Sequence, residues 1–348
     1  MSNSTILHIM EDDKFIEPFI RFVEDHHKPQ VHHFIISGKN PHSTLRARKN
    51  LTTIHGMQQT LRLLFSIASK GLIANKIILH GLHNKRLILL ISLMPWLLKR
   101  SYWFIWGADL YAFQTKDHTW RNKVDDFLRR CTIPKIGHLV SYLPGDIALA
   151  RQHYQAKGIY HECLLYPSNI CNAYELPKKE DLNTHILIGN SATTSNNHLE
   201  IFEKIKTLRQ NNLILHCPLS YGNQHYALHI AEQGRKHFGD NFNALLSFMD
   251  FNSYLKLLGS IDVAIFAHAR QQAMGNIINL IGAGKTVFLR ENTSSWAFLN
   301  QMGFYIKTFE AFNFEKITQA QAEHNQQLAV NIFSSKNLSL QLSQLFDR

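Results

Sequence analysis

The sequence has few cysteines and no long apolar run. None of its four cysteines is in a Cys-x-x-Cys spacing, so neither a disulfide framework nor a cysteine-based zinc site is predicted. The start, MSNSTILHIMEDDKF, lacks the basic and apolar regions of a secretory signal. No apolar stretch reaches the ~20 residues that a membrane-spanning helix needs. These absences predict a protein of a reducing cytoplasm.

Several common catalytic motifs are also missing. No Gly-x-Gly-x-x-Gly follows a predicted strand, and no Ser lies in Gly-x-Ser-x-Gly, so a nicotinamide or flavin enzyme and a hydrolase are disfavoured. The stretch GAGKT at 282–286 is similar to a nucleotide-phosphate loop, but that loop needs a glycine where Asn279 stands. We therefore predict that GAGKT ends a helix and turns into a strand. The 21 histidines lack the spacing of metal ligands.

Apolar patterning predicts an α/β protein. Short runs rich in β-forming residues alternate with segments of helical periodicity along all 348 residues. The predicted strands are 6–10, 32–37, 76–81, 102–107, 185–190, 213–218, 262–267 and 286–291. Such alternation predicts two doubly wound domains with parallel sheets facing a cleft. We expect a first domain at 1–166, a linker at 167–184 rich in Pro, Asn and charge, and a second domain at 185–348 whose last helix packs on the first.

Positive charge is concentrated in the first half of the chain. Residues 1–170 contain 22 Lys and Arg against 12 Asp and Glu, whereas residues 171–348 contain 15 against 14. This imbalance predicts an anionic partner: a phospholipid surface, a diphosphate-linked substrate or nucleic acid. In KRLILLISLMPWLLKR, residues 85–100, apolar residues lie between Lys85-Arg86 and Lys99-Arg100. This segment is either a core helix, which we favour, or a helix at the lipid headgroups.

The second domain contains the better candidate for an anion site. Arg270, Gln271 and Gln272 follow a predicted strand, and Gly275 and Asn276 open the next helix. Free N–H groups and the positive end of the helix dipole at that point favour a phosphate. The run GNSATTSNNH, with Gly189, Asn190 and Ser191, either donates N–H and O–H groups to a ligand or merely starts a helix.

Acidic residues follow two predicted strands of the first domain. Asp109, in IWGADLY, could orient a sugar hydroxyl or take its proton, although capping of the following helix is the simpler interpretation. Glu-Asp-Asp at 11–13 suggests a metal-binding acidic pair, a helix cap, or a catalytic carboxylate at Asp13.

Taken together, the stretches IWGADLY, ILIGNSATTSNNH, PLSYG, MDFNSYLKLLGSIDVAIFAHARQQAMG and LREN resemble a bacterial family, glycosyltransferase family 56. Its members are TDP-N-acetylfucosamine:lipid II N-acetylfucosaminyltransferases, which act in making enterobacterial common antigen. ADLY and ARQQ-x-x-G are the most specific of these pieces.

The resemblance implies a GT-B fold with two Rossmann-like domains, a TDP-sugar held by the second and a polyprenyl-diphosphate-linked acceptor held by the first. The implied catalytic residues are Asp13 and Asp109. The implied donor-binding residues are Gly189, Asn190, Ser191, Tyr221, Arg270, Gln271, Gln272, Gly275, Asn276, Glu291 and Asn292. The implied acceptor or membrane residues are His80, Asn84, Lys85, Arg86, Lys99 and Arg100.

The leaving diphosphate would then be stabilised by Arg270 and helix N–H groups, without a metal or other cofactor. We expect a peripheral protein on the cytoplasmic face of the bacterial inner membrane, bound to an anionic membrane surface, with no nucleic-acid partner. The alternatives are a GT-B enzyme with another donor, such as a UDP-sugar, and acceptor, or a basic nucleic-acid-binding protein. No nucleic-acid-binding motif supports the latter.

Overall fold

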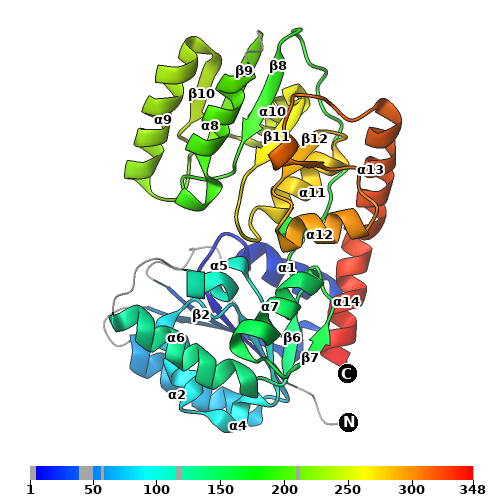
Figure 1. Cartoon of the computed structure of the whole chain (residues 1–348). Helices are drawn as coiled ribbons and strands as arrows, with labels where there is room; N and C mark the ends of the chain where they lie inside the picture. Colours follow the sequence, from blue (N-terminus) through cyan, green and yellow to red (C-terminus); the bar gives the residue numbers. More distant parts are fainter. Residues whose placement is uncertain (1–4, 39–49, 56–58, 115–119, 209–211, 348) are drawn as a thin grey trace. The chain divides into compact units, whose positions relative to one another are not determined.

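The computed structural model describes residues 5–38, 50–55, 59–114, 120–208 and 212–347 (Figure 1). The chain divides into two compact units. The first comprises Met1–Ser168 and Ser335–Arg348, and the second comprises Asn169–Ser334. Each unit is built around its own parallel sheet.

The first unit contains a seven-stranded parallel sheet in the order β3-β2-β1-β4-β5-β6-β7. Its strands are β1 (Ile6–Glu11), β2 (His32–Ser37), β3 (Leu51–Ile54), β4 (Lys76–His80), β5 (Ser101–Phe104), β6 (His138–Val140) and β7 (Ile159–His161). Its helices are α1 (Ile16–His26), α2 (Gln59–Ile73), α3 (Lys85–Ser92), α4 (Pro95–Leu98), α5 (Gly107–Leu110), α6 (Trp120–Thr132), α7 (Pro144–Tyr154) and α14 (Ser335–Asp347). The central strands are buried on both faces, as expected where helices cover both sides of a parallel sheet.

The second unit contains a six-stranded parallel sheet in the order β10-β9-β8-β11-β12-β13. Its strands are β8 (Thr184–Ile188), β9 (Leu213–Pro218), β10 (Phe242–Leu245), β11 (Val263–Phe266), β12 (Thr286–Leu289) and β13 (Lys307–Thr308). Its helices are α8 (His198–Thr207), α9 (Gln224–Phe238), α10 (Phe251–Ser260), α11 (Met274–Gly282), α12 (Ser294–Gln301) and α13 (Gln319–Ile332). Single 3-10 turns occupy Pro29–Val31, Tyr111–Gln114, Ile133–Lys135, Pro167–Asn169, Thr194–Asn196, Gly239–Asn241 and Phe309–Ala311.

Strand order reverses once in each sheet, and these reversals locate the candidate sites. The first reversal lies between β1 and β4, and the second lies between β8 and β11. In open parallel sheets, ligands bind outside the carboxyl ends of the strands where the order reverses. The loops that follow these four strands are therefore the ones to inspect.

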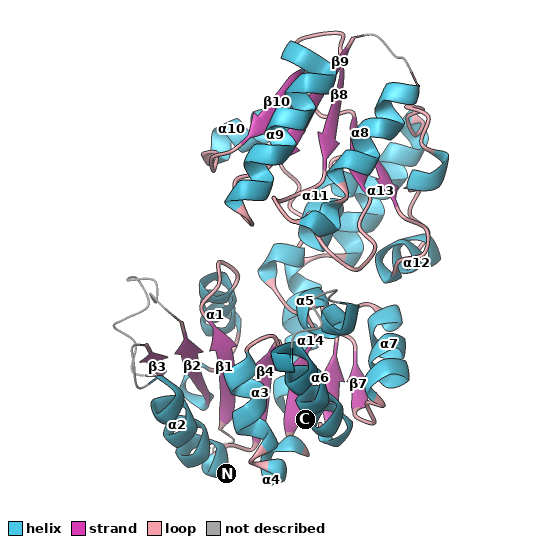
Figure 2. Cartoon of the chain, turned by 60° about the vertical axis from the view of Figure 1, so that its left-hand side comes forward, coloured by secondary structure: helices cyan, strands magenta, loops and turns pink. Residues whose placement is uncertain are grey.

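The last helix, α14, belongs to the first unit. The Nζ of Lys76 donates to the carbonyls of Leu345 and Phe346, at 2.8 Å each, and so satisfies the free carbonyls at the end of the helix. The side chain of Gln341 accepts from the backbone N–H of Leu164 at 2.9 Å. Figure 2 shows the carboxyl end of the chain beside the first sheet.

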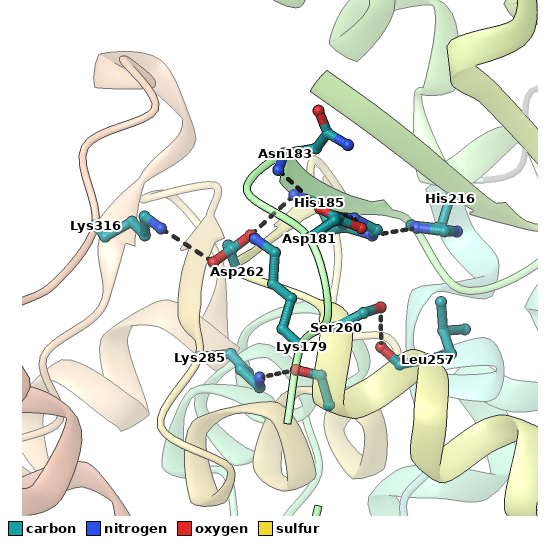
Figure 3. A network of polar contacts seen from close by, with 11 residues as sticks. Lys179, Asp181, Asn183, His185, His216, Leu257, Ser260, Asp262, Lys285 and Lys316 are labelled. Carbon is teal, nitrogen blue, oxygen red and sulfur yellow. Dashed lines mark hydrogen bonds and ion pairs between the residues drawn. The ribbon is translucent and has the colours of Figure 1, made fainter. Parts of the chain in front are cut away.

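A polar network at the amino ends of the strands of the second sheet holds the segment before β8 in place (Figure 3). Lys179 and Lys316 both pair with Asp262, which directly precedes β11, and the backbone N–H of His185 donates to the same carboxylate at 2.9 Å. Burial alone would raise the pKa of Asp262, but the donors from Lys179, His185 and Lys316 lower it. Because this edge carries the amino ends of the strands, the network is structural.

All eight strands predicted from the sequence are present. The strands missed are β3, β6, β7, β10 and β13, which have two to four residues each. The segment 85–100 forms α3 and α4, whose residues Leu87, Ile88, Leu90 and Ile91 are buried in the core of the first unit. The core-helix interpretation is therefore confirmed, and a helix lying whole at the lipid headgroups is not.

Candidate functional site

The loop after β8 requires its glycine. Gly189 has a positive φ of 64°, and a Cβ at this position would lie 2.6 Å from the side-chain oxygen of Asn196. That same oxygen accepts the backbone N–H of Asn190 at 2.9 Å. The close approach of backbone and amide therefore sets the turn and excludes a side chain.

Asn196 is the buried hub of this loop. Its Nδ2 donates to the carbonyl of Ser191 at 3.0 Å and to the hydroxyl of Thr193 at 2.8 Å. Its Oδ1 also accepts from Nε2 of His268, at 2.9 Å, in the loop after β11. Burial, helped by the charges of Arg270 and nearby groups, lowers the pKa of His268 to about 3, so the ring is neutral near pH 7 with its proton on Nε2.

Gln272 joins the two loops directly. Its Oε1 accepts from the hydroxyl of Ser195 at 2.7 Å, and its Nε2 donates to Oδ1 of Asn190 at 3.1 Å. Asn190 in turn donates from Nδ2 to the hydroxyl of Tyr221 at 2.6 Å. The structure thus brings together Asn190, Tyr221 and Gln272, which are far apart in sequence and were singled out from it.

The amino end of α11 lies beside this network. The helix starts at Met274, one residue before the predicted Gly275, and its preceding residue Ala273 has a left-handed φ of 60° without a side-chain cap. The first-turn N–H groups of such a helix have no helical acceptor and attract an anion. Arg270, half-buried, donates from Nη1 to the carbonyl of Gln271 at 3.3 Å.

The other end of α11 is a turn, as predicted. The helix ends at Gly282, Gly284 has a φ of 71°, and the N–H of Lys285 donates to the carbonyl of Leu280 at 2.9 Å before β12 begins. GAGKT is therefore a helix end and not a phosphate loop.

A cavity of about 390 Å³ opens next to the start of α11. Asn190, Tyr221 and Asn276 contribute to its wall, and Phe248 and Tyr254 add aromatic surface. The rings of Tyr221 and Phe248 are nearly parallel, at 8°, with centroids 6.3 Å apart. Flat apolar walls beside a helix amino end have the shape and polarity to take a nucleotide, with its base in the cavity and its phosphates at the helix.

In the first unit, Glu11 and His83 meet where the strand order reverses. Oε2 of Glu11, at the end of β1, lies 3.0 Å from Nε2 of His83, which follows β4. Burial alone would lower the pKa of His83, but the hydrogen bond to Glu11 and the charges of Asp109, Glu11 and Asp13 raise it. Asp13 is half-buried, and its Oδ1 accepts the N–H of Phe15 at 3.1 Å.

Asp109 is a fully buried structural carboxylate. Its Oδ2 accepts from the N–H of Leu82 and from Nε1 of Trp103, both at 2.7 Å. Its Oδ1 accepts from the N–H groups of Trp106, at 2.9 Å, and Leu110, at 2.8 Å. Burial raises its pKa, and the charge of His83 together with the donors from Trp103, Leu82 and Leu110 offsets part of the rise. With four donors on two oxygens, Asp109 caps α5 and holds the loop after β4, which favours the capping interpretation over a catalytic one.

Three buried histidines form a directed chain that leads to this edge. Nε1 of Trp106 can only donate, at 2.9 Å to the hydroxyl of Tyr166, which in turn lies 2.6 Å from Nδ1 of His80. Because Trp106 cannot accept the hydroxyl proton of Tyr166 and His80 can, we assign that proton to the bond with His80. The order continues from Nε2 of His80 to Nδ1 of His8 at 3.1 Å, and from Nε2 of His8 to Nδ1 of His32 at 2.9 Å.

This chain changes the expectation for His80. Burial lowers the pKa of His80 to about 3, so the ring is neutral, and it is only 2% exposed. An acceptor substrate can therefore be affected by His80 only through Tyr166 and Trp106. The direct acceptor contact expected from the sequence is not supported.

Most of the other predicted acceptor or membrane residues already have partners within the protein. Asn84 caps α3 by accepting the N–H of Arg86 at 2.9 Å. Lys85 pairs with Asp125, Nη1 of Arg86 donates to Gln59 at 2.9 Å, and Nη1 of Arg100 donates to the carbonyl of Ala74 at 2.5 Å. Lys99 is exposed, as are the predicted donor residues Glu291 and Asn292 after β12.

Sequence reasoning missed several residues of both sites. Ser195 and Asn196 lay in the run GNSATTSNNH, which was expected either to donate to a ligand or to start a helix, but neither they nor His268 were named as site residues. Glu11 and His83 are far apart in the sequence, so their contact could be found only by placing β1 next to β4 in the sheet. Within the described residues, no group of three or more His, Cys, Asp or Glu is arranged to hold a metal ion. The described helices are too short or too polar to cross a membrane.

The fold is that of GT-B glycosyltransferases. Similar solved structures include a glycosyltransferase from Rickettsia africae ESF-5 (12% identity, 100% of this chain and 98% of that one, TM-score 0.64). WaaG, a glycosyltransferase involved in lipopolysaccharide biosynthesis, matches at 12% identity over 98% of each chain, with a TM-score of 0.64. HepE of Anabaena, solved in complex with UDP, matches at 10% identity over 99% of each chain, with a TM-score of 0.66.

A family profile is more specific than these structures. The profile described as 4-alpha-L-fucosyltransferase, glycosyl transferase group 56, matches residues 3–338. The chain belongs to this family and is a glycosyltransferase. This membership replaces the nucleic-acid-binding alternative.

Proposed function

We propose that the enzyme transfers a 4-acetamido-4,6-dideoxygalactose-type sugar from a TDP-sugar to a glycan linked to a polyprenyl diphosphate. The reaction would serve bacterial surface polysaccharide synthesis of the enterobacterial common antigen kind, at the cytoplasmic face of the inner membrane. Family membership supports the reaction class. The identity of sugar and acceptor is supported by the resemblance of the motifs.

The observation that carries the donor assignment is the junction at Gln272. This residue fixes the loop after β8, whose Asn190 lines the cavity with Tyr221, to the segment that opens α11, whose Asn276 lines the same cavity. In our proposal the base lies in the cavity and the diphosphate lies at the helix. Arg270 and the helix dipole then stabilise the negative charge that develops on the leaving TDP, without a metal ion.

The first unit would hold the acceptor. Its surplus of basic residues suits a diphosphate-linked lipid, and the edge formed by Glu11, His83 and Trp106 offers carboxylate, imidazole and aromatic surface to a sugar. Trp106 is oriented there by the histidine chain through Tyr166. We assign no nucleophile.

A nucleotide screen followed by a transfer assay tests the proposal. Thermal shift should show TDP stabilising the protein more than UDP, ADP or GDP at equal concentration. Transfer should then require a TDP-linked sugar and a polyprenyl-diphosphate glycan. Stabilisation by UDP with none by TDP would instead point to a GT-B enzyme with a different donor.

A further inference from the structure

Three helices of the first unit form one continuous face. Nη1 of Arg86 on α3 donates to Gln59 on α2 at 2.9 Å, and Lys85 on α3 donates to Asn122 on α6 at 3.1 Å and pairs with Asp125. Figure 2 shows α2, α3 and α6 side by side on the first unit. We call this surface the α2-α3-α6 face.

Large apolar side chains lie on the solvent side of this face. On α2, Leu61 is 59% exposed and Phe65 is 70% exposed, whereas Leu63 and Ile67 point into the core. The outer stripe is thus separate from the inner one. A surface helix of an ordinary soluble protein has polar residues on its outer side.

Exposed apolar side chains also lie on α6 and on the segment that follows α3. Trp120 is 71% exposed and Phe127 is 64% exposed, two turns apart on the outer side of α6. Leu93 and Trp96, after α3, are exposed as well. Exposed aromatic side chains gathered on one face mark an interaction surface.

The charge of the face is positive. Residues 59–100, which include α2, α3 and α4, contain no Asp or Glu, but they contain Arg62, Lys70, Lys85, Arg86 and Lys99. The acidic residues of α6 are both paired, Asp125 with Lys85, and Asp126 with Nε of Arg130 at 2.7 Å. Arg62 and Lys123 are exposed beside the apolar residues of α2 and α6.

We propose that the α2-α3-α6 face binds an anionic lipid surface, with Phe65 and Phe127 entering the boundary between headgroups and acyl chains and Arg62 and Lys123 contacting the headgroups. This inference rests on the proposed function, since a lipid-linked acceptor remains in the bilayer. The combination of exposed aromatic and cationic side chains with paired acids is the complement of such a surface. Docking of this face against a second copy of itself is disfavoured, because the two cationic surfaces would repel each other.

The docking surface is therefore wider than the segment 85–100 predicted from the sequence. That segment contributes mainly core residues, while α2 and α6 provide the aromatic anchors. The proposal predicts that substitutions on α2 and α6 weaken membrane binding although they leave 85–100 unchanged.

Co-sedimentation with phosphatidylglycerol-containing vesicles tests the proposal, with pure phosphatidylcholine vesicles for comparison. The double variant Phe65→Ser/Phe127→Ser should bind anionic vesicles at least about tenfold more weakly than the parent, because the two aromatic side chains that enter the lipid are lost. Arg62→Ser/Lys123→Ser should also bind more weakly and should lose part of the salt dependence. The matched controls are Leu228→Ser/Leu340→Ser and Arg235→Ser/Lys236→Ser, which remove exposed residues elsewhere and should bind like the parent.

Transfer to a short-tailed soluble acceptor separates this proposal from the proposed function. The docking variants should retain parental transfer to that acceptor while losing transfer to acceptor in vesicles. If the Phe65→Ser/Phe127→Ser variant sediments with anionic vesicles like the parent, the lipid assignment is wrong. A parent that is dimeric by light scattering, and becomes monomeric on this double substitution, would instead identify the face as a contact between copies. If the docking variants lose vesicle binding as predicted, but neither they nor the parent transfer sugar to any acceptor, only the proposed function is refuted.

Discussion

Acidification should destabilise the first unit through the chain of His32, His8 and His80. Burial lowers the pKa of His80 to about 3, and burial with neighbouring histidines lowers that of His32 to about 4. The pKa of His8 is also lowered, by burial and by His32 and His80. The chain needs all three rings neutral, because each shared hydrogen lies between one donor nitrogen and one acceptor nitrogen.

The sign and size of the effect follow from proton linkage. A histidine with a depressed folded pKa binds its proton in the unfolded state first, so its stabilisation is complete above the unfolded pKa of about 6.5 and is lost as pH falls toward the folded value. At about pH 5 His80 and His32 each lower the free energy of unfolding by about 2 kcal/mol relative to about pH 7.5. Together they account for a loss of roughly 4 kcal/mol, a large fraction of the stability of an ordinary domain, and His8 acts in the same direction.

Denaturant unfolding at the two pH values measures this loss. Tryptophan fluorescence reports mainly on the first unit, because Trp96, Trp103, Trp106 and Trp120 lie there and only Trp296 lies in the second. In His32→Gln the new side chain still accepts from His8 but does not titrate, so the pH-dependent loss should shrink by about 2 kcal/mol. The control His225→Gln, at an exposed position on α9, should leave it unchanged. Equal losses in His32→Gln and the parent would refute the neutral chain.

Three further outcomes test the second unit and the leaving group. Arg270→Ala should lower kcat/KM by about a hundredfold or more with the fold intact, since a charge-assisted contact to developing phosphate charge is worth that much. The control Arg235→Ala should have near-normal turnover. Near-normal turnover of Arg270→Ala would show that Arg270 is not part of the site. Gly189→Ala should lower the free energy of unfolding by about 2 kcal/mol or more. The new Cβ would clash with Asn196, and the alanine would also have to keep the positive φ of this position. Gly239→Ala, which has a positive φ but open space around it, should cost only about 1 kcal/mol in the same denaturation experiment, and equal losses would refute the steric argument. Transfer should survive excess EDTA, and a loss restored by magnesium or manganese would support a metal at residues 11–13.

The sequence was sufficient for the fold and for locating the polar loops that follow β8 and β11. Runs such as KIILHG and DVAIFA are mostly apolar and long enough to identify central strands. Polar residues at their carboxyl ends fall at one edge of the sheet by the geometry of parallel strands. Strands of two to four residues, such as β7 and β13, contain too little pattern to detect.

Side-chain contacts across the first sheet were beyond the sequence. Whether Asp109 faced a ligand or capped a helix depended on Trp103 and Leu82 both pointing at it, and no spacing rule encodes that. The histidine chain likewise arises because β2, β1 and β4 are neighbours in an order that differs from their order along the chain. The sequence shows that α2 contains many apolar residues, but which of them are exposed can be decided only when the core is known.

Hydrogen–deuterium exchange with and without TDP tests the central claim most directly, namely that the nucleotide donor binds where β8 and β11 meet. The account predicts slower exchange on TDP addition in residues 189–196 and 268–277, with little change in residues 81–84 of the first unit. Protection confined to the first unit, or none in either segment at saturating TDP, would contradict it.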